Sequence, residues 1–400
     1  MRRRGFLARS LALGCLAAAS PLITPVAFAQ APWENRLIVV ILRGAMDGLD
    51  VVRPVGDPDF AALRRATLGR EPGLPLDGFF EMHPALGRLM PLWRAGDLGF
   101  VHAVSTPYRS GRSHFDGQDL LEAGSTEAGA ARGGVRGGWL NRMLQAVPGI
   151  TGETTYAIGR SQSLLTDGPA PVSSWSPEAQ LRLSPQAERL LELVHHDDPI
   201  FREASTEAIR LAALMADSAE AVEEGDAMMG ELAGVGGAHV ELARFAADRL
   251  REEARIATFS LNGWDTHANQ SRGIARSLRA LTDVILTLQA RLGPDWDRTA
   301  LVAMTEFGRT ARENGSEGTD HGTGGAMVLA GGAIDGGRVL GGWPGLSEAD
   351  LYEGRDLMPT RDLRAHAAWL MAGLFGLDRA TLEGAVFPGL GMGADPGLLL

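Results

Sequence analysis

Five short, nearly uninterrupted apolar runs predict buried β-strands. Continuous runs of this kind, without alternation of polar residues, are typical of parallel strands covered on both faces. The runs are Arg36–Leu42, Leu98–Val104, Ile256–Leu261, Thr299–Thr305 and Ala326–Ala330. Helical spacing of apolar residues occurs between them in His83–Ala95 and Ile274–Leu292, and after them in Arg361–Leu377. Strands alternating with helices predict an α/β fold, with a mostly parallel sheet and helices on both of its faces.

One long segment departs from this alternation. Residues from about 175 to 253 are rich in Ala, Glu, Leu and Arg, and they have helical periodicity with almost no strand pattern. Pro169, Pro171 and the Ser173-Ser174 pair mark the start of the segment. We therefore expect a single α/β domain over residues 30–400 that carries a helical cap insertion at about 175–253.

The N-terminus has the features of an export signal. Arg2-Arg3-Arg4-Gly5-Phe6-Leu7 precedes the apolar run Leu11–Ala19, and Ala27-Phe28-Ala29 provides a small-x-small cleavage site. This arrangement predicts a twin-arginine signal peptide over residues 1–29, the twin-arginine export machinery as a partner, and a periplasmic or secreted protein. The alternatives are an ordinary secretory signal or an uncleaved anchor. No later stretch reaches the roughly 20 apolar residues of a membrane span, so none is expected in the mature form.

Composition excludes several classes of function. The formal net charge is -11, and the acidic body without a basic block argues against nucleic acid and anionic membrane surfaces as partners. The chain contains no lysine, which excludes a Schiff base and a P-loop lysine. Cys15 is the single cysteine and lies in the N-terminal apolar stretch. Disulfides, thiolate metal sites and cysteine nucleophiles are thus excluded from the body, and any metal must be held by His, Asp, Glu or other oxygen donors.

Candidate chemistry follows the predicted strands. Ligand sites of open α/β sheets form outside the carboxyl ends of the strands, so these loops are expected to converge. The polar residues in them are Asp47 after the first strand, Ser105, Ser110, Ser113 and His114 after the second, Asp265 and His267 after the third, Glu306 after the fourth, and Asp320 and His321 before the fifth. Mixed imidazole and carboxylate ligands suit zinc, manganese or non-haem iron, whereas carboxylates alone suit calcium or magnesium. Each residue also has a structural alternative: Asp47 and Ser113 can cap helices.

Five motifs in fixed order carry a family resemblance. They are Leu42-Arg43-Gly44 with Asp47-Gly48-Leu49, Arg112-Ser113-His114-Phe115-Asp116, Gly263-Trp264-Asp265-Thr266-His267, Glu306-Phe307-Gly308-Arg309-Thr310 and Thr319-Asp320-His321-Gly322. Across nearly the whole mature chain, the sequence resembles the exported bacterial family known as domain of unknown function 1501. That family in turn resembles the superfamily of alkaline phosphatases, sulfatases and phosphoglycerate mutases.

The resemblance implies a set of site residues. The implied metal ligands are Asp47, Asp265, His267, Glu306, Asp320 and His321. The implied catalytic residues are Ser113 as nucleophile, His114 to orient it, and Arg109 to hold an anion, with Arg112 and Arg43 as alternatives to Arg109. Ser105, in a sulfatase-like Ser-x-Pro-x-Arg context, and Ser110 are rival nucleophiles. Two features depart from the superfamily pattern: Asp265 and His267 have Asp-x-His spacing, and Phe307 stands where an imidazole is expected.

These observations predict an exported hydrolase of phosphate or sulfate esters that depends on a divalent metal ion: zinc, manganese, calcium or magnesium. Its substrate is expected to be a small anionic ester. The alternative is a non-catalytic exported binding or assembly protein on a degenerate hydrolase scaffold, which the altered spacing and Phe307 favour.

The N-terminal motif generates a direct prediction. Replacing both Arg3 and Arg4 by Lys should leave unprocessed precursor in the cytoplasm, because the twin-arginine pathway depends on that pair. Immunoblotting of cytoplasmic and periplasmic fractions measures the result. Normal processing and export of the doubly substituted protein would contradict dependence on this pathway.

Overall fold

The structure is a computed structural model that describes residues 33–65, 72–109, 111–126, 137–147, 150, 152, 154–158, 163–175 and 237–400. These residues belong to one compact unit, Ala29–Ser176 with Gly237–Leu400. The predicted signal peptide, Ser110 and most of the predicted cap lie outside the described residues.

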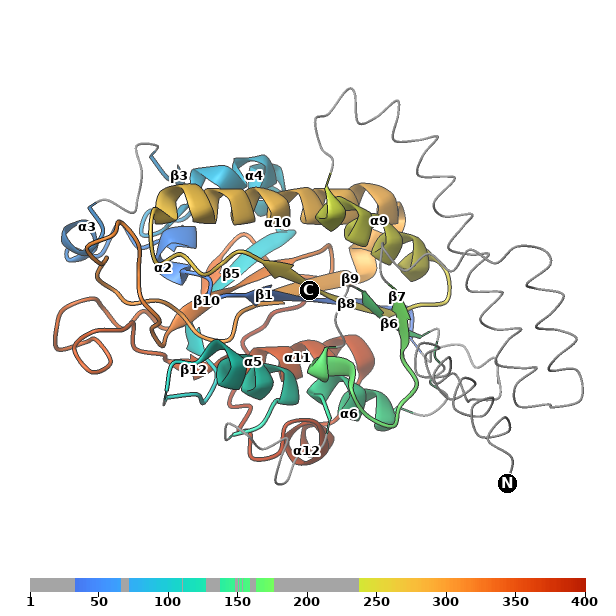
Figure 1. The fold of residues 1–400 in the computed structure, drawn as a ribbon. Helices are drawn as coiled ribbons and strands as arrows, with labels where there is room; N and C mark the ends of the chain where they lie inside the picture. Colours follow the sequence, from blue (N-terminus) through green and yellow to red (C-terminus); the bar gives the residue numbers. More distant parts are fainter. Residues whose placement is uncertain are drawn as a thin grey trace, which may run out of the picture. The chain divides into compact units, whose positions relative to one another are not determined.

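A nine-stranded sheet forms the centre of this unit, in the order β11-β5-β10-β9-β1-β8-β6-β7, with β12 also paired to β5 (Figure 1). β1 lies between β8 and β9 and is parallel to both. β6 pairs parallel with β8 and β7, and β11 and β12 pair parallel with β5. The strands are β1 Arg36–Arg43, β5 Leu98–Ser105, β6 Thr155–Ile158, β7 Ser173–Trp175, β8 Ile256–Asn262, β9 Thr299–Met304, β10 Gly325–Ala330, β11 Val339–Leu340 and β12 Arg361–Asp362.

The predicted α/β class is confirmed, and all five apolar runs are strands of this sheet. One strand differs in direction: β10 is antiparallel to both β9 and β5. The connection from β9 to β10 contains no α-helix. The chain therefore re-enters the sheet at the end where β9 stops, and it does not cross to the opposite end. A chain that re-enters at the same edge pairs antiparallel, whereas a parallel neighbour needs a crossover to the opposite edge.

Four strands of this sheet, β6, β7, β11 and β12, were not predicted from the sequence, and β12 takes the first two residues of the helix expected over Arg361–Leu377. Ser173 and Ser174, which were expected to mark the start of the cap, lie in β7, and β7 pairs with the equally unexpected β6. Strands of three and four residues with Ser and Thr among them do not produce a continuous apolar run. β6 and β7 therefore lie outside the apolar runs from which strands were expected.

Helices cover both faces of the sheet (Figure 1). α4 (Met90–Ala95), α9 (Ala238–Arg251) and α10 (Gln270–Leu292) lie on one face, and α5 (His114–Ala123), α6 (Trp139–Gln145) and α11 (Leu363–Phe375) lie on the other. α9 falls within the range of the predicted cap and packs along α10. No helix among the described residues is long and apolar enough to cross a membrane.

Shorter elements complete the unit. They are the helices α2 Gly48–Val51, α3 Phe60–Leu63 and α12 Arg379–Thr381, the 3₁₀ turns Pro84–Leu89, Leu164–Thr166 and Gly293–Arg298, the π-helical turn Leu382–Val386, and a small antiparallel sheet of β2 Val52–Arg53, β4 Glu81–Met82 and β3 Leu74–Pro75.

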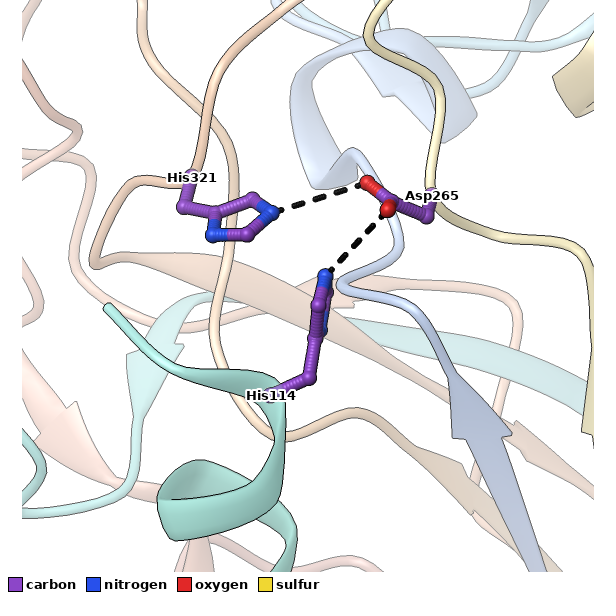
Figure 2. Close-up of side chains that lie close together, drawn as sticks. All are labelled: His114, Asp265 and His321. Carbon is purple, nitrogen blue, oxygen red and sulfur yellow. Dashed lines mark ion pairs between the residues drawn. The ribbon is translucent and has the colours of Figure 1, made fainter.

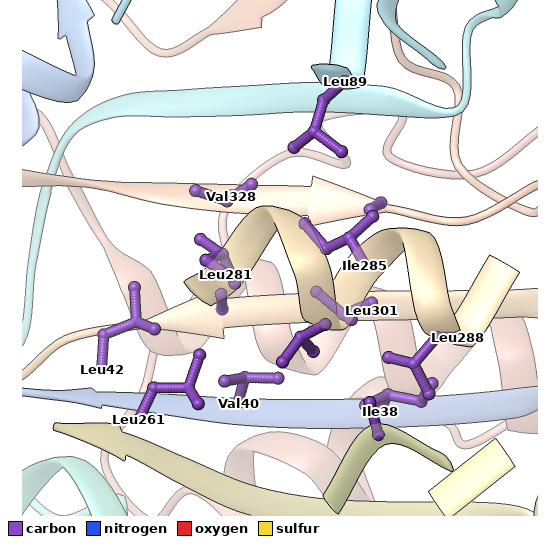
Figure 3. Close-up of a cluster of buried hydrophobic side chains, with 14 of the residues drawn as sticks. Ile38, Val40, Leu42, Leu89, Leu261, Leu281, Ile285, Leu288, Leu301 and Val328 are labelled. Carbon is purple, nitrogen blue, oxygen red and sulfur yellow. The ribbon is translucent and has the colours of Figure 1, made fainter. Parts of the chain in front are cut away.

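β1 shows why its apolar run has no polar interruption. Ile38, Val40 and Leu42 face one helical layer, where they pack with Leu281, Ile285 and Leu288 of α10 (Figure 3). The alternate side chains of the strand enter the core on the opposite face, with residues of α6 and α11. Both faces of this central strand are therefore dry, and its loops leave from a rigid edge of the sheet.

Three imidazoles are buried in this framework: His83, His102 and His366. His102 is held as a neutral ring, because its Nδ1 accepts from the amide of Ala103 at 2.9 Å and its Nε2 lies 2.9 Å from the carbonyl oxygen of Val52. Burial lowers the pKa of His102 and of His366 to about 4, and that of His83 to about 3.

These pKa values predict loss of stability in acid. The unfolded chain takes up protons near pH 6.5 and the folded chain only near pH 4, so the free energy of unfolding should fall as the pH drops below 6.5. Each buried imidazole should contribute about 1.4 kcal/mol per pH unit in that window. Urea denaturation at pH 7, 6 and 5 measures the slope. His102→Gln should reduce the dependence of the free energy of unfolding on pH. An unchanged pH dependence in that variant would refute the lowered pKa of His102.

Candidate metal centre

Three loops bring His114, Asp265 and His321 together at one edge of the sheet (Figure 2). His114 is the first residue of α5, Asp265 lies between β8 and α10, and His321 lies in the segment before β10. One potential ligand atom from each of the three lies within 4.8 Å of the other two. The sequence separates them by more than 50 residues at each step, so only the convergence of strand ends explains the cluster.

Glycine allows the loops to approach this closely. Gly44, after β1, has a φ of 120°, and a Cβ on it would lie 2.5 Å from the amide nitrogen of Asp265. Gly322 packs on the backbone of Arg309, where a Cβ would lie 2.3 Å from the carbonyl carbon. A side chain at either position would force the loops apart.

Two imidazoles are held from behind so that Nε2 faces the centre. The Nδ1 of His321 lies 2.7 Å from the carbonyl oxygen of Arg112, which can only accept, so Nδ1 carries the proton. The Nδ1 of His114 lies 2.8 Å from Oε1 of Glu306 and donates to that carboxylate. The Nε2 of His114 is buried and has no hydrogen-bond partner among the described residues. Both rings therefore present an Nε2 lone pair to the same point.

His267 completes the cluster. Its Nε2 lies 2.9 Å from Nε2 of His321 and 3.2 Å from Oδ1 of Asp265. Its Nδ1 lies 3.3 Å from Oδ1 of Asp320. Two imidazole lone pairs repel at such a distance unless a proton or a cation lies between them. The candidate metal group among the described residues is His114, Asp265 and His321, and His267 lies directly beside it as a further candidate ligand.

Asp265 is oriented by Arg309, whose side chain is buried. The Nη2 of Arg309 donates to Oδ1 of Asp265 at 2.5 Å, and Oδ2 lies 3.5 Å from Nε2 of His114. Burial acts to raise the pKa of Asp265, but the Arg309 guanidinium, with His267 and His114, brings it below the ordinary value. Asp265 is thus an anionic donor at neutral pH.

The donor set fits a transition metal better than calcium or magnesium. Neutral imidazole nitrogens with one carboxylate suit zinc, manganese or iron, whereas calcium and magnesium prefer oxygen ligands throughout. The side chains of Asp265 and His267 are 45% and 46% exposed, so the centre is reached from solvent on their side.

Asp47, an expected metal ligand, has a different environment. Its carboxylate is buried and accepts from Nη1 and Nη2 of Arg64, from Nε2 of Gln270 at 2.6 Å and from the amide of Leu49. Burial acts to raise the pKa of Asp47, but Arg64 holds it below the ordinary value. Asp47 caps α2, and its oxygens are occupied by protein donors.

Glu306 and Asp320, also expected as ligands, lie behind the imidazoles. Glu306 contacts Nδ1 of His114 and is fully buried, and Asp320 contacts Nδ1 of His267 and is half exposed. Of the six expected ligands, the structure thus places Asp265, His267 and His321 at the centre. It adds His114, which was expected to orient a nucleophile.

The expected catalytic serines have structural contacts. Ser113 is the N-cap of α5, where its side chain accepts from the amide of Asp116. Ser105 is buried, and its Oγ accepts from Arg109 at 3.3 Å. Arg109 itself donates to the carbonyl oxygens of Thr106 and Tyr108 within its own loop. Ser110, the third expected serine, lies outside the described residues.

The sequence analysis assigned no role to Arg309 or Arg64, which hold Asp265 and Asp47 in place. Arg309 belongs to the motif Glu306-Phe307-Gly308-Arg309-Thr310, and its place three residues after Glu306 is the sequence feature that could have indicated a role near the site. Arg64 is in no motif, and its pairing with Asp47 comes from tertiary structure alone.

Comparisons with known proteins agree with the motif pattern. A family model described as protein of unknown function (DUF1501) matches residues 98–381. No curated protein matches the sequence significantly.

Several solved structures are similar at low identity. The C-terminal periplasmic domain of EcEptC from Escherichia coli is 12% identical, with a TM-score of 0.32 and coverage of 77% of this chain and 76% of that chain. A mutant TAB5 alkaline phosphatase with Mg bound in its M3 site is 12% identical, with a TM-score of 0.36 and coverage of 78% and 95%. A protein in the alkaline phosphatase superfamily from Vibrio parahaemolyticus is 11% identical, with a TM-score of 0.31 and coverage of 80% and 68%. All three TM-scores are below 0.5, so we infer neither fold nor function from them.

The contacts of Asp47 generate a prediction that separates a structural role from ligation. Arg64→Met should cost about 3–5 kcal/mol of stability, because it leaves the buried Asp47 carboxylate without its counter-charge. Denaturant unfolding measures this loss, and the metal content of the folded variant should be unchanged. If Asp47→Asn instead folds normally and loses metal, Asp47 is a ligand after all.

Proposed function

The chain belongs to the DUF1501 family of proteins of unknown function, and for this member we propose the activity of an exported, metal-dependent hydrolase of phosphate or sulfate esters. The observation that carries the proposal is the convergence of His114, Asp265 and His321, each with one ligand atom within 4.8 Å of the other two. The Nε2 of His267 lies beside this group, 2.9 Å from Nε2 of His321.

His114, His267, His321 and Asp265 are the proposed holders of the ion. Glu306, Asp320 and the Arg112 carbonyl group hold the Nδ1 side of the three rings. A divalent ion there supplies Lewis-acid chemistry, which stabilises negative charge on a phosphoryl or sulfuryl oxygen. Arg309 already offsets the charge of Asp265, the carboxylate in this donor set. The positive charge of the ion itself favours an anionic oxygen of the substrate as a further ligand.

Two arginines beside His321 support a small anionic ester as the substrate. The carbonyl oxygen of Arg112 accepts from His321, and Nη2 of Arg355 donates to the carbonyl oxygen of His321 at 3.0 Å. Both side chains are partly exposed, and both form an ion pair with the buried Asp356. Guanidinium groups fixed in this way bind anionic oxygens, which is the role proposed for Arg112 here.

Ser113 remains the proposed nucleophile, because it immediately precedes His114 and its loop reaches the centre. Its capping contact with Asp116 is long, at 3.5 Å, and does not exclude a second role. The competing function is that of a non-catalytic exported binding or assembly protein on a degenerate hydrolase scaffold. The contacts of Ser105, Ser113 and Arg109 within their own loop favour that alternative.

Export through the twin-arginine machinery is part of the proposal. Arg2-Arg3-Arg4 and Ala27-Phe28-Ala29 support it, and this route carries proteins that have already folded. A centre built from loops of several strands requires a folded chain before it can hold metal. We therefore propose that the protein acquires its metal before export and acts in the periplasm or outside the cell.

Protein purified from its producing cell should contain about one equivalent of a divalent transition metal, measured by plasma mass spectrometry. It should hydrolyse p-nitrophenyl phosphate or sulfate, and chelation should abolish that activity. Ser113→Ala should abolish turnover while leaving metal content unchanged and costing about 1 kcal/mol of stability through the lost cap.

Ser105→Ala is the matched control for the nucleophile. Loss of activity in Ser105→Ala alone would move the nucleophile to that position. Full metal content without hydrolysis of either ester would favour the non-catalytic alternative, and protein without metal that still turns over substrate would refute the metal centre.

A further inference from the structure

Glu306 is a buried carboxylate whose described partners are all neutral groups or His114. Its side chain is 0% exposed. Oε1 accepts from the amide of Gly44 at 3.0 Å, from Nε2 of Gln118 at 3.0 Å and from Nδ1 of His114 at 2.8 Å. Oε2 accepts from Oγ1 of Thr305 at 2.8 Å. No arginine forms an ion pair with Glu306 among the described residues.

Other buried carboxylates nearby are compensated in a different way. Each has a guanidinium partner: Asp47 with Arg64, Asp50 with Arg53, Glu122 with Arg43, and Asp356 with Arg355 and Arg112. A buried ion without a counter-ion is strongly unfavourable, and hydrogen bonds from neutral donors offset only part of that cost. Among the described residues Glu306 therefore has no guanidinium partner, and His114 is the ionisable group that contacts it.

His114 connects Glu306 to the place where such a charge can be. The Nδ1 of His114 donates to Glu306, and its buried Nε2 faces Asp265 and has no hydrogen-bond partner among the described residues. A cation on Nε2 places positive charge one imidazole away from the carboxylate. In return, a carboxylate on Nδ1 makes the ring a stronger electron donor.

From this arrangement we propose that Glu306 is a positioning residue for the metal ion: it acts through His114 and its buried charge is balanced by the bound cation. The role rests on the proposed metal centre. It replaces the expectation that Glu306 binds metal directly, because both of its oxygens are occupied by the four donors. Metal binding and the stability of the fold are coupled at this residue.

Glu306→Gln tests the role, because the amide keeps the shape and an acceptor for His114 but removes the charge. Its amide nitrogen, placed toward Thr305, can donate to the Oγ1 of that residue, so the hydrogen-bond network is preserved. The probe is Co²⁺ added to metal-free protein at pH 8, followed by its visible absorption spectrum and by thermal unfolding with and without the ion.

We expect three results for Glu306→Gln. Affinity for Co²⁺ falls about 10- to 100-fold. The shape of the cobalt spectrum is retained, because the ligands are the same. The metal-free variant unfolds at a temperature equal to or above that of metal-free wild type, since an uncompensated charge has been removed, while the rise in Tm on adding Co²⁺ is smaller.

Asp320→Asn is the matched control. It makes the same carboxylate-to-amide change behind His267, but Asp320 is 53% exposed and its charge is solvated. Its effect on Co²⁺ affinity should be much smaller. A second test uses His114→Ala: adding Glu306→Gln to it should cause no further loss of affinity, because the path to the ion is already broken.

Several outcomes would overturn the role. They are a Co²⁺ affinity of Glu306→Gln equal to wild type, a spectrum changed as in His114→Ala, equal destabilisation with and without metal, or an equal effect of Asp320→Asn. If Glu306→Gln fails to fold, Glu306→Asp, which keeps the charge, must bind Co²⁺ with an affinity near that of wild type. Failure of the wild-type protein to bind Co²⁺ would refute the metal centre itself. If wild type binds Co²⁺ normally and one of these contrary outcomes is found, only the role of Glu306 is refuted.

Discussion

The buried guanidinium of Arg309 holds together the loops that form the metal centre. Its Nε donates to the carbonyl oxygen of Ala45 after β1 at 3.0 Å, its Nη1 to that of Thr319 at 3.2 Å, and its Nη2 to Asp265 after β8 at 2.5 Å. These contacts fix three chain segments at one edge of the sheet. The strands supply a rigid base, since β1, β8 and β9 end together and are buried on both faces. Arg309 thereby adds side-chain contacts to the backbone hydrogen bonds that already join these loops, such as that from the amide of Thr319 to the carbonyl oxygen of Thr266 at 3.1 Å.

The buried carboxylates near the candidate metal centre differ in how their charge is compensated. Asp47 has its counter-charge in Arg64, so its oxygens stabilise the loop after β1 and do not need a metal. Glu306 has neutral donors and His114, and its charge is directed through the ring toward the centre. Both residues follow buried strands and both are buried, so burial alone does not distinguish them. The difference is the presence or absence of an arginine within reach.

The candidate centre is held by buried groups on the Nδ1 side of two imidazoles and is exposed to solvent on the side of Asp265 and His267. His114 and His321 are fixed by a buried carboxylate and a carbonyl group, whereas Asp265 and His267 are about half exposed. The proposed ester substrate would therefore approach from the side of Asp265 and His267. The Arg112 carbonyl group and the Arg355 side chain contact His321. The proposed hydrolase would thus bind its substrate from one defined side of the centre. Phe307, which stacks on His114 at 5.2 Å between ring centres, fills the space behind the ring with an apolar group.

The amino-acid sequence by itself determined the five buried strands, the helices between them and the presence of Asp265, His267 and His321 at one edge, because continuous apolar runs and strand-end loops are local features. Tertiary structure alone decided the antiparallel direction of β10, the short strands β6 and β7, and the roles of His114, Asp47 and Glu306. Each of those roles depends on a partner far away in the chain: His114 and Glu306 are 192 residues apart, and Arg309 and Ala45 are 264 apart. A carboxylate has the same local pattern whether an arginine, an imidazole or a metal ion will face it. The identity of that neighbour is set only when the strands pair and the loops meet.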